Sequence, residues 1–273
     1  MNKRATSVLD YLYEAPGPKT KRRVAVWTGI SFTLLVLFLG LVLLQFYKTG
    51  QFEWRYWSFF FRATTWIFFA KGLWGTLEAA VLAGFVAFTL GFVMMLGRFS
   101  YSKIVQKIAR FFIEFTRGVP TLLFIYFFFL GLPLLGIKLP ALLQIALPVA
   151  ISASGTVAEA LRSGVLAVPH GQKEAAQSLG LSRRAVFFKV LFPQGFKYVI
   201  PSLISEIVIV VKDTTFAYIV SFPDLMQNAK VIISNYDAML SVYLFVAIVY
   251  IVVNYLLNKL STFFANRSSG RKH

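Results

Sequence analysis

The sequence has no cysteine and only two histidines, one of which is the last of its 273 residues. Without cysteine there is no disulfide framework, no thiolate metal site and no cysteine nucleophile. Two isolated histidines also argue against a catalytic histidine network or a multi-histidine metal centre. No GxxxxGK[ST] phosphate-binding loop occurs either. We therefore expect no catalytic site in this chain and no cofactor or metal bound by it.

Apolar and aromatic side chains are abundant. Hydrophobic residues make up 58% of the chain and charged residues only 14%, with 29 phenylalanines. Soluble domains carry about 25% charged residues, so a water-soluble globular fold is excluded. Disordered and collagen-like chains are excluded by the same composition. The chain is predicted to be an all-α polytopic membrane protein, because helices satisfy their own backbone hydrogen bonds in a bilayer.

The net charge of +17 has two interpretations. A basic domain can bind nucleic acid, but its cations then gather on one face. Here the cations flank the apolar runs, which is the pattern of the positive-inside rule. We therefore expect contact with the lipid bilayer and no contact with nucleic acid.

Six apolar runs are long enough to be transmembrane helices, since ~20 residues cross a ~30 Å hydrocarbon core. With the amino terminus in the cytoplasm, 21 of the 28 basic residues fall on the cytoplasmic side and 6 outside. This bias predicts cytoplasmic termini, with basic tails at 1–23 and 261–273. The runs are 24–47, which is an additional first helix, and 73–96, 119–135, 139–157, 198–222 and 239–257. Residues 223–238 are predicted to be a polar loop.

The segment 48–71 is dense in aromatic residues and also carries charges. Glu53, Arg55 and Arg62 leave too short an uncharged run for another span, and tryptophan and tyrosine favour the bilayer surface. We expect an interfacial aromatic segment on the extracytoplasmic side. A nucleic-acid stacking platform is the alternative interpretation of aromatic residues interleaved with arginine.

The cytoplasmic segment 159–197 is too long for a simple turn. A short helix is predicted after Pro169, over about 172–179, and Gly180 suits the residue that follows such a helix in the left-handed conformation. Ser182 is expected to cap a second helix.

This second helix is expected to end before Pro193. The first helix carries Ala175 and Ala176, whose small side chains would let the groove of a partner protein approach closely. The alternative is an ordinary amphipathic loop helix.

Four motifs occur in order along the chain. They are Glu114 with Arg117-Gly118-Val119-Pro120; Glu159-Ala160-Leu161-Arg162-Ser163-Gly164; Glu174-Ala175-Ala176 followed by Gly180, Val190 and Phe192-Pro193; and Lys212-Asp213-Thr214-Thr215-Phe216. They resemble the E-x-x-RGTP, AE-x-x-RGG, EAA and K-x-TSL motifs of ABC importer permeases, in particular those of the glutamate, glutamine, arginine and histidine group.

The resemblance covers roughly 72–260 and implies a five-helix type I importer core behind the additional first helix. It implies a multi-pass protein of the bacterial cell membrane that serves binding-protein-dependent, ATP-driven import of a polar amino acid, with glutamate or a related amino acid as first candidate. In that family the EAA helix docks on the ATPase. The coupling residues are then Gly171, Gln172, Glu174, Ala175, Ala176 and Gly180.

The resemblance also implies partners. ATP and Mg would bind to partner ATPase subunits, and an extracytoplasmic amino-acid-binding protein would deliver the substrate. A second permease chain would complete the path, and the additional first helix favours a heterodimer over a homodimer.

Ionisable residues inside spans usually face a cavity or a partner. Glu78 and Lys212 each lie six residues from the outer end of their predicted spans, so a Glu78–Lys212 pair is predicted. Lys212 can instead bind a substrate carboxylate. Glu206 and Asp213 are seven residues apart, share a helix face and can meet a substrate ammonium. A structural ion pair between helices is the alternative. The candidate substrate path is Lys212, Asp213, Thr214, Thr215, Glu78, Glu206, Glu159, Arg162 and Arg117.

Two other classes of membrane protein remain alternatives. A secondary transporter or a channel would not need the predicted coupling loop. A membrane enzyme would need a catalytic constellation in its aqueous loops, and the sequence offers none.

Overall fold

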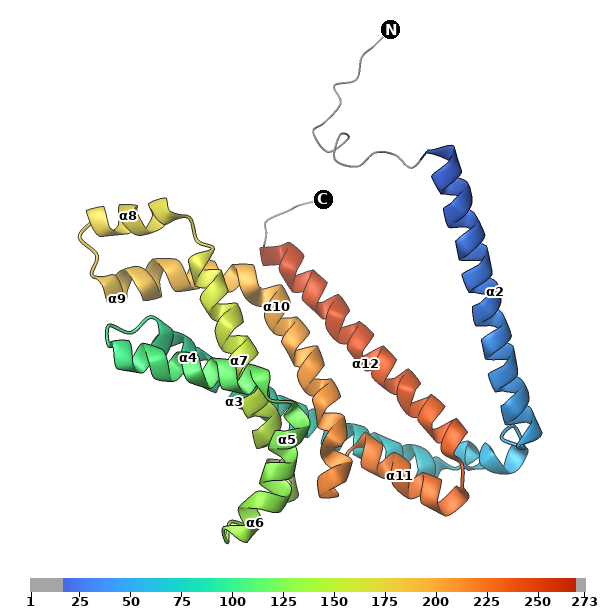
Figure 1. Ribbon diagram of the computed structural model, residues 1–273. Helices are drawn as coiled ribbons and strands as arrows, with labels where there is room; N and C mark the ends of the chain where they lie inside the picture. Colours follow the sequence, from blue (N-terminus) through green and yellow to red (C-terminus); the bar gives the residue numbers. More distant parts are fainter. Residues whose placement is uncertain (1–16, 269–273) are drawn as a thin grey trace. The chain divides into compact units, whose positions relative to one another are not determined.

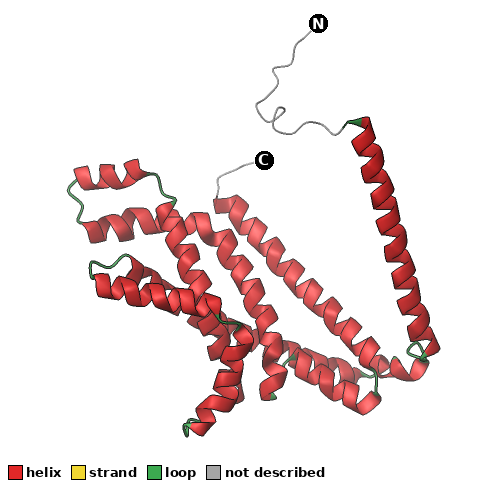
Figure 2. Cartoon of the chain, in the orientation of Figure 1, coloured by secondary structure: helices red, strands yellow, loops and turns green. Residues whose placement is uncertain are grey.

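The structure is a computed structural model that describes residues 17–268, so parts of the predicted tails, 1–16 and 269–273, lie outside the described residues. Figure 2 shows that the described part of the chain consists of helices and turns without a strand, which confirms the all-α class. The chain divides after Trp57 into two compact units. Each unit is described by itself.

The first unit contains one long helix, α2 (Pro18–Lys48), followed by the single turn η1 (Trp54–Tyr56). The helix begins six residues before the predicted start at 24, so the basic residues Lys19 to Arg23 form its first turns instead of a tail. Pro18 permits this start, because the first helical position needs no backbone N–H. None of the residues of α2, all of them described, is buried.

The second unit opens with the turn η2 (Ser58–Phe61) and the helix α3 (Ala63–Arg98). The expected division between an aromatic segment ending at 71 and a span beginning near 73 is therefore wrong at the level of secondary structure. Residues 63–71 are the first turns of a single helix of 36 residues. Eight uncharged residues precede Lys71, so nothing interrupts the helix.

Two of the aromatic residues at this junction, Phe59 and Phe69, are buried and packed against other aromatic rings. Phe59 is completely buried and stacks on Tyr236 with ring centroids 5.1 Å apart. Phe69 meets Phe245 at 4.4 Å. Such aromatic pairs contribute to stability beyond the area that they bury, and their burial argues against a nucleic-acid stacking platform.

The next helix, α4 (Lys103–Gly118), covers a stretch that was predicted only as polar and basic. Ser102 caps it by accepting a hydrogen bond from the Val105 backbone N–H. After Gly118 the chain turns by 99° and continues as one helical rod, which Figure 1 shows leaving α4 in a new direction. The rod comprises α5 (Thr121–Tyr126), the π-helical turn η3 (Phe127–Gly131) and α6 (Leu132–Leu134).

Two more helices differ from the predicted boundaries. The predicted span 139–157 is extended in α7 (Ala141–Leu166), which places Glu159 and Arg162 on the same helix as that span. The predicted polar loop 223–238 is the helix α11 (Leu225–Tyr236), capped by Asp224. The remaining elements are α8 (His170–Ser178), α9 (Arg183–Val186), η4 (Phe187–Leu191), α10 (Phe192–Asp213), η5 (Thr214–Val220) and α12 (Met239–Ser268).

The core of the second unit forms around α7, which packs against α3, α4, α5 and α10. Small residues line the contact of α7 with α3, as is usual where helices pack closely in membranes. The buried alanines at the core are Ala79, Ala83 and Ala87 on α3 and Ala146, Ala150 and Ala153 on α7.

The number of spans is lower than six when it is counted by apolarity. Among the described residues, four helices are long and apolar enough to cross a membrane, namely α2, α3, α7 and α12, and the bent α4–α6 pair makes a fifth. Helix α10 has 22 residues, about 33 Å, but it carries Lys197, Glu206, Lys212 and Asp213.

Candidate functional site

The predicted coupling helix is α8, and its end has the predicted geometry. Gly180 follows the helix with a φ of +78°. The Gly180 N–H donates to the Gln177 carbonyl at 2.9 Å, and the Leu181 N–H donates to the Ala176 carbonyl at 3.2 Å. These two bonds form a Schellman motif, in which glycine is favoured because the left-handed conformation is strained for other residues.

The exposed surface of α8 carries all but one of the predicted coupling residues. Gly171, Gln172, Glu174 and Ala175 are exposed, as is Gly180 beyond the helix end. Ala176 is only 5% exposed because it packs against the rest of the chain. The expectation that both alanines offer a small-residue surface is thus wrong for the second of them.

The segment after α8 forms a hairpin with it. Ser182 caps α9 by accepting a hydrogen bond from the Ala185 N–H at 3.3 Å, as predicted. The helix does not end before Pro193, however, because residues 183–213 are helical throughout. The π-helical turn η4 precedes Pro193, which occupies the first turn of α10, where its missing N–H is tolerated.

The hairpin is joined to the core by a contact between two backbones. A Cβ atom built on Gly164 of α7 would lie 2.5 Å from the carbonyl oxygen of Gly195. A Cβ atom built on Gly195 of α10 would lie 2.6 Å from the carbonyl oxygen of Gly164. No side chain fits between the two helices at this crossing. Gln172 of α8 is also hydrogen-bonded to Gln194 at 3.2 Å, so α8, α7 and α10 are held together near one point.

The other end of α10 carries a polar network between three helices. The Thr121 hydroxyl of α5 donates to the Asp213 carboxylate at 2.9 Å. It also lies 2.9 Å from the Ser152 hydroxyl of α7. Since Thr121 gives its one proton to Asp213, Ser152 donates to Thr121. The sequence identified Asp213 as a candidate, whereas Thr121 was missed and Ser152 was not assigned a role.

Glu206 lies seven residues before Asp213 and is only 7% exposed. It lines a cavity of about 360 Å³ between α3, α10 and α12 whose other lining residues, such as Leu77, Phe88 and Leu257, are apolar. Within residues 17–268 Glu206 has neither a hydrogen bond nor an ion pair. Burial of a carboxylate without a partner costs free energy. Such a group in a membrane protein is therefore usually found where a ligand or a proton binds.

The predicted Glu78–Lys212 pair is absent from the described part of the chain, in which both side chains are exposed. The reasoning from depth fails because α3 begins at Ala63 and not near 73. Glu78 is therefore fifteen residues beyond the start of its helix, whereas Lys212 is the penultimate residue of α10.

The remaining candidates have local roles or exposed positions. Glu159 and Arg162 form a bidentate ion pair on α7, with contacts of 2.9 and 2.5 Å. Thr214 donates to the Val211 carbonyl at 2.8 Å, which is the local role that threonines in helices usually have. Arg117 is exposed and Thr215 is half-buried.

A second buried carboxyl group lies outside the predicted sites. Asp224 is fully buried and caps α11 by accepting a hydrogen bond from the Gln227 N–H at 2.7 Å. Its other oxygen, Oδ2, has no hydrogen-bond partner among the described residues. Burial raises the pKa of the Asp224 carboxyl to about 6. Sequence reasoning missed this residue because it assigned 223–238 to a loop.

The comparisons with known proteins agree with these features. Residues 87–270 match the family profile described as "Binding-protein-dependent transport system inner membrane component". The chain is 32% identical over 220 residues to the glutamate transport system permease protein GluD of Corynebacterium glutamicum, covering 78% of this chain and 80% of the relative. It is 33% identical over 200 residues to the "Probable glutamine ABC transporter permease protein GlnM" of Bacillus subtilis, covering 70% and 93%.

A solved structure is similar as well. A crystal structure of an amino acid ABC transporter with histidines has 32% sequence identity and a TM-score of 0.70, over 73% of this chain and 94% of that chain. The likeness thus extends from the motifs to the arrangement of the helices.

Proposed function

The chain belongs to the family of binding-protein-dependent transport system inner membrane components, and on that premise we propose that it is the permease subunit of an ATP-driven importer for a polar amino acid. The observation that carries this proposal is the unbroken helical segment 183–213. It runs from the exposed hairpin with α8, where an ATPase can dock, to Asp213, where a substrate can bind.

The charges of α10 suit the groups that every amino acid shares. Glu206 and Asp213 are anionic groups for an α-ammonium, and the exposed Lys212 is a cation for an α-carboxylate. This pairing supports an amino acid as substrate but does not select its side chain. Glutamate, or a related polar amino acid, is our first choice because GluD is named as a glutamate permease and GlnM as a glutamine permease.

The coupling part of the proposal concerns α8. Glu174 and Ala175 face outward, so they can enter a cleft on an ATPase subunit, which would bind ATP and Mg. A second permease chain, in a heterodimer, would complete the path, and an extracytoplasmic binding protein would supply the substrate. This chain itself has no catalytic role in the proposal.

The proposed topology has six spans in the bacterial cell membrane with both termini in the cytoplasm. Helix α10 is the sixth span in addition to the five apolar ones. Its charged residues would face the translocation path, because ionisable groups in a span usually face a water-filled cavity or a partner.

The test is uptake by the complex reconstituted in vesicles with its ATPase and binding protein. Labelled glutamate, glutamine, arginine and histidine are offered with ATP and with a non-hydrolysable analogue. We expect ATP-dependent uptake of glutamate, and no uptake by a Glu174→Lys complex. Uptake without ATP would indicate a secondary transporter or a channel instead. ATP-dependent uptake of arginine or histidine alone would contradict the choice of glutamate only.

A further inference from the structure

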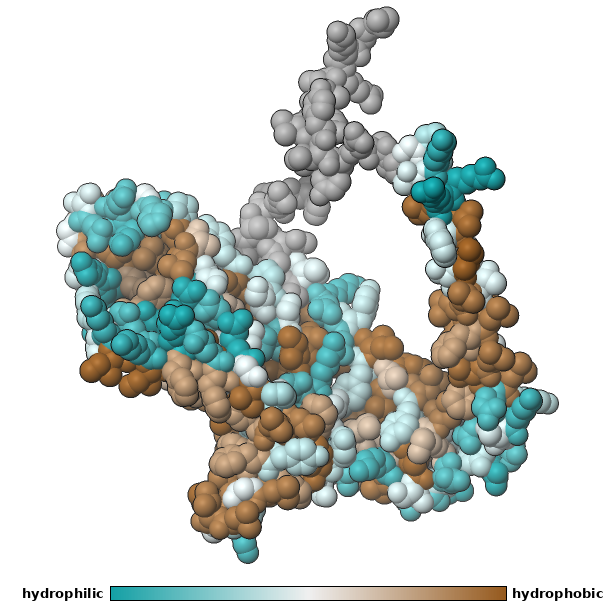
Figure 3. Space-filling view, viewed as in Figure 1, coloured by the Kyte–Doolittle hydropathy of each residue, from teal (hydrophilic) through white to brown (hydrophobic). Residues whose placement is uncertain are grey.

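A large cavity among the described residues lies away from the proposed substrate path. It encloses about 820 Å³ between the end of α3, the start of α4, the end of α7 and the hairpin of α8 with α9 and η4. In Figure 3 a hydrophobic surface is visible here between hydrophilic rims over α8–α9 and α4. The apolar part of the wall comprises Leu96, Phe99, Val165, Leu166, Phe187 and Leu191.

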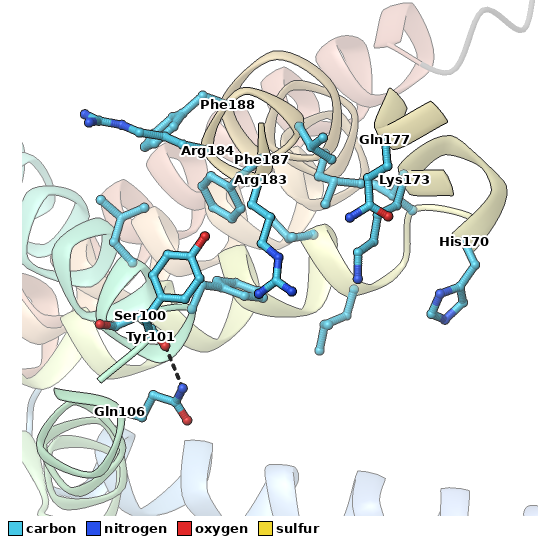
Figure 4. Close-up of a pocket in the computed structure, with 17 residues that line it drawn as sticks. Ser100, Tyr101, Gln106, His170, Lys173, Gln177, Arg183, Arg184, Phe187 and Phe188 are labelled. Atoms are coloured by element: carbon cyan, nitrogen blue, oxygen red, sulfur yellow. Dashed lines mark hydrogen bonds between the residues drawn. The ribbon is translucent and has the colours of Figure 1, made fainter. Parts of the chain in front are cut away.

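The polar part of the wall is cationic. Lys173, Arg183 and Arg184 line the cavity, together with His170, and no aspartate or glutamate does so among the described residues. Figure 4 shows the Arg183 and Lys173 side chains approaching the same space from α9 and α8, whereas Arg184 extends away from it.

None of the three cations Lys173, Arg183 and Arg184 forms an ion pair within residues 17–268. The Arg183 guanidinium lies 5.8 Å from the centre of the Tyr101 ring, a cation–π contact that orients the group without neutralising it. The loop that carries Tyr101 is fixed by the Gln106 side chain, which donates to the Ser100 carbonyl at 2.6 Å.

The cavity lies where two apolar helices end. Helix α3 ends at Arg98 and α7 at Leu166, so the cavity lies beside the ends of two helices that are long and apolar enough to cross a membrane. Leu166 is 57% exposed and Phe188 is 41% exposed. An occupant of this cavity would therefore meet cations and apolar side chains at the same time.

We propose that this cavity binds the phosphate headgroup of an anionic phospholipid, with Arg183 and Lys173 as the phosphate ligands and the apolar wall against the first part of an acyl chain. Guanidinium and ammonium groups are the usual partners of phosphate, and basic pockets beside transmembrane helices are typical sites for anionic headgroups. Charge alone would also suit an acidic surface of the ATPase. The apolar wall favours the lipid, because an acidic protein surface would leave it uncovered.

The proposal goes beyond the transport function, and its primary readout is lipid binding without transport. The permease–ATPase complex is purified, exchanged into zwitterionic phosphatidylcholine, and titrated with phosphatidylglycerol, and bound lipids are counted by native mass spectrometry. Arg183→Gln should weaken phosphatidylglycerol binding roughly fivefold, as expected for one cation near a lipid surface, and the Arg183→Gln/Lys173→Gln double variant roughly 25-fold.

The matched control is Lys189→Gln, which removes an exposed cation of the adjacent turn η4 that does not line the cavity. It should leave phosphatidylglycerol binding unchanged, and Arg183→Lys should retain most of it. Equal affinity of the wild type for both lipids would overturn the proposal. So would displacement of the lipid by inorganic phosphate, which would indicate a free anion. Loss of ATPase association by Arg183→Gln, with unchanged lipid binding, would assign the cavity to a protein partner instead.

Discussion

At the residue scale, the charges of α10 are found in three different environments. Lys212 is exposed, Asp213 accepts a hydrogen bond from Thr121, and Glu206 is buried at an apolar cavity. Lys212 and Asp213 are adjacent in the sequence but have different surroundings, since successive residues of a helix point about 100° apart. Each side chain can be tested separately.

Lys212→Met should abolish uptake and leave the fold intact. The side chain is exposed and forms no ion pair in the described part of the chain, so the cost in stability should be within about 0.5 kcal/mol. Lys197→Met, an exposed cation on the same helix, is the control and should transport normally. Melting temperature and initial uptake rate are the two measurements. Full uptake by Lys212→Met would show that another group recognises the carboxylate.

Asp224→Asn should remove a dependence of stability on pH. Burial raises the pKa of Asp224 to about 6 in the folded chain, whereas the unfolded carboxyl titrates near 4. The folded state thus binds the proton more tightly, so the free energy of unfolding should rise as the pH falls from about 6 to about 4, by on the order of 2 kcal/mol. Asparagine retains the cap and carries no charge.

The measurement is the melting temperature of the wild type and the variant between about pH 7 and pH 4.5. Asp237→Asn, which changes an exposed aspartate at the other end of α11, should keep the pH dependence of the wild type. An unchanged pH profile in Asp224→Asn would contradict this assignment.

At the element scale, the hairpin was largely predictable because its signals are local. Gly180 and Ser182 act on backbone groups within three or four residues, and such signals can be identified in a sequence. The α3 start, α11 and the run through Pro193 were predicted wrongly, since polar composition does not exclude a helix and proline is tolerated in a first turn. The Thr121–Ser152–Asp213 network joins three helices, which spacing along one helix does not reveal.

Gly180→Val and Glu174→Lys should impair coupling through different causes. Valine is strained at a φ of +78°, so the end of α8 should distort, at a cost of about 1 kcal/mol or more. Glu174→Lys reverses an exposed charge and should weaken ATPase binding without affecting stability. Gly29→Ala is the control, because this exposed glycine of α2 is not a coupling residue and a Cβ there meets nothing within 4 Å. Co-purification of the ATPase and its substrate-stimulated activity are the readouts, and normal values in both variants would remove α8 as the coupling element.

At the scale of the whole molecule, the spans were predicted better than their ends. The all-α class and the long apolar helices follow from composition, because the bilayer requires apolar helical spans. The family follows from short motifs that can be read directly in the sequence. The ends do not, because a helix such as α3, of 36 residues and thus about 54 Å, exceeds the ~30 Å hydrocarbon core.

Cysteine labelling can establish the topology. The chain has no native cysteine, so Thr49→Cys and Lys71→Cys each introduce a single reactive thiol. Both should react with an impermeant maleimide added from outside, because residues 51–71 are expected not to cross the bilayer. Ser182→Cys, in the proposed cytoplasmic hairpin, should react only after the membrane is opened. Labelling of positions 49 and 71 from opposite sides would contradict the six-span arrangement.

The crossing of Gly164 and Gly195 gives the helical segment 183–213 a fulcrum. Measured along the helix, the arm from Gly195 to Arg183 is twelve residues, about 18 Å, and the arm to Asp213 is eighteen residues, about 27 Å. If the segment turns as one body about this point, a movement of the hairpin is enlarged about one and a half times at Asp213. A small movement that an ATPase imposes on the hairpin would thus reach the proposed substrate-binding end of α10 as a larger one.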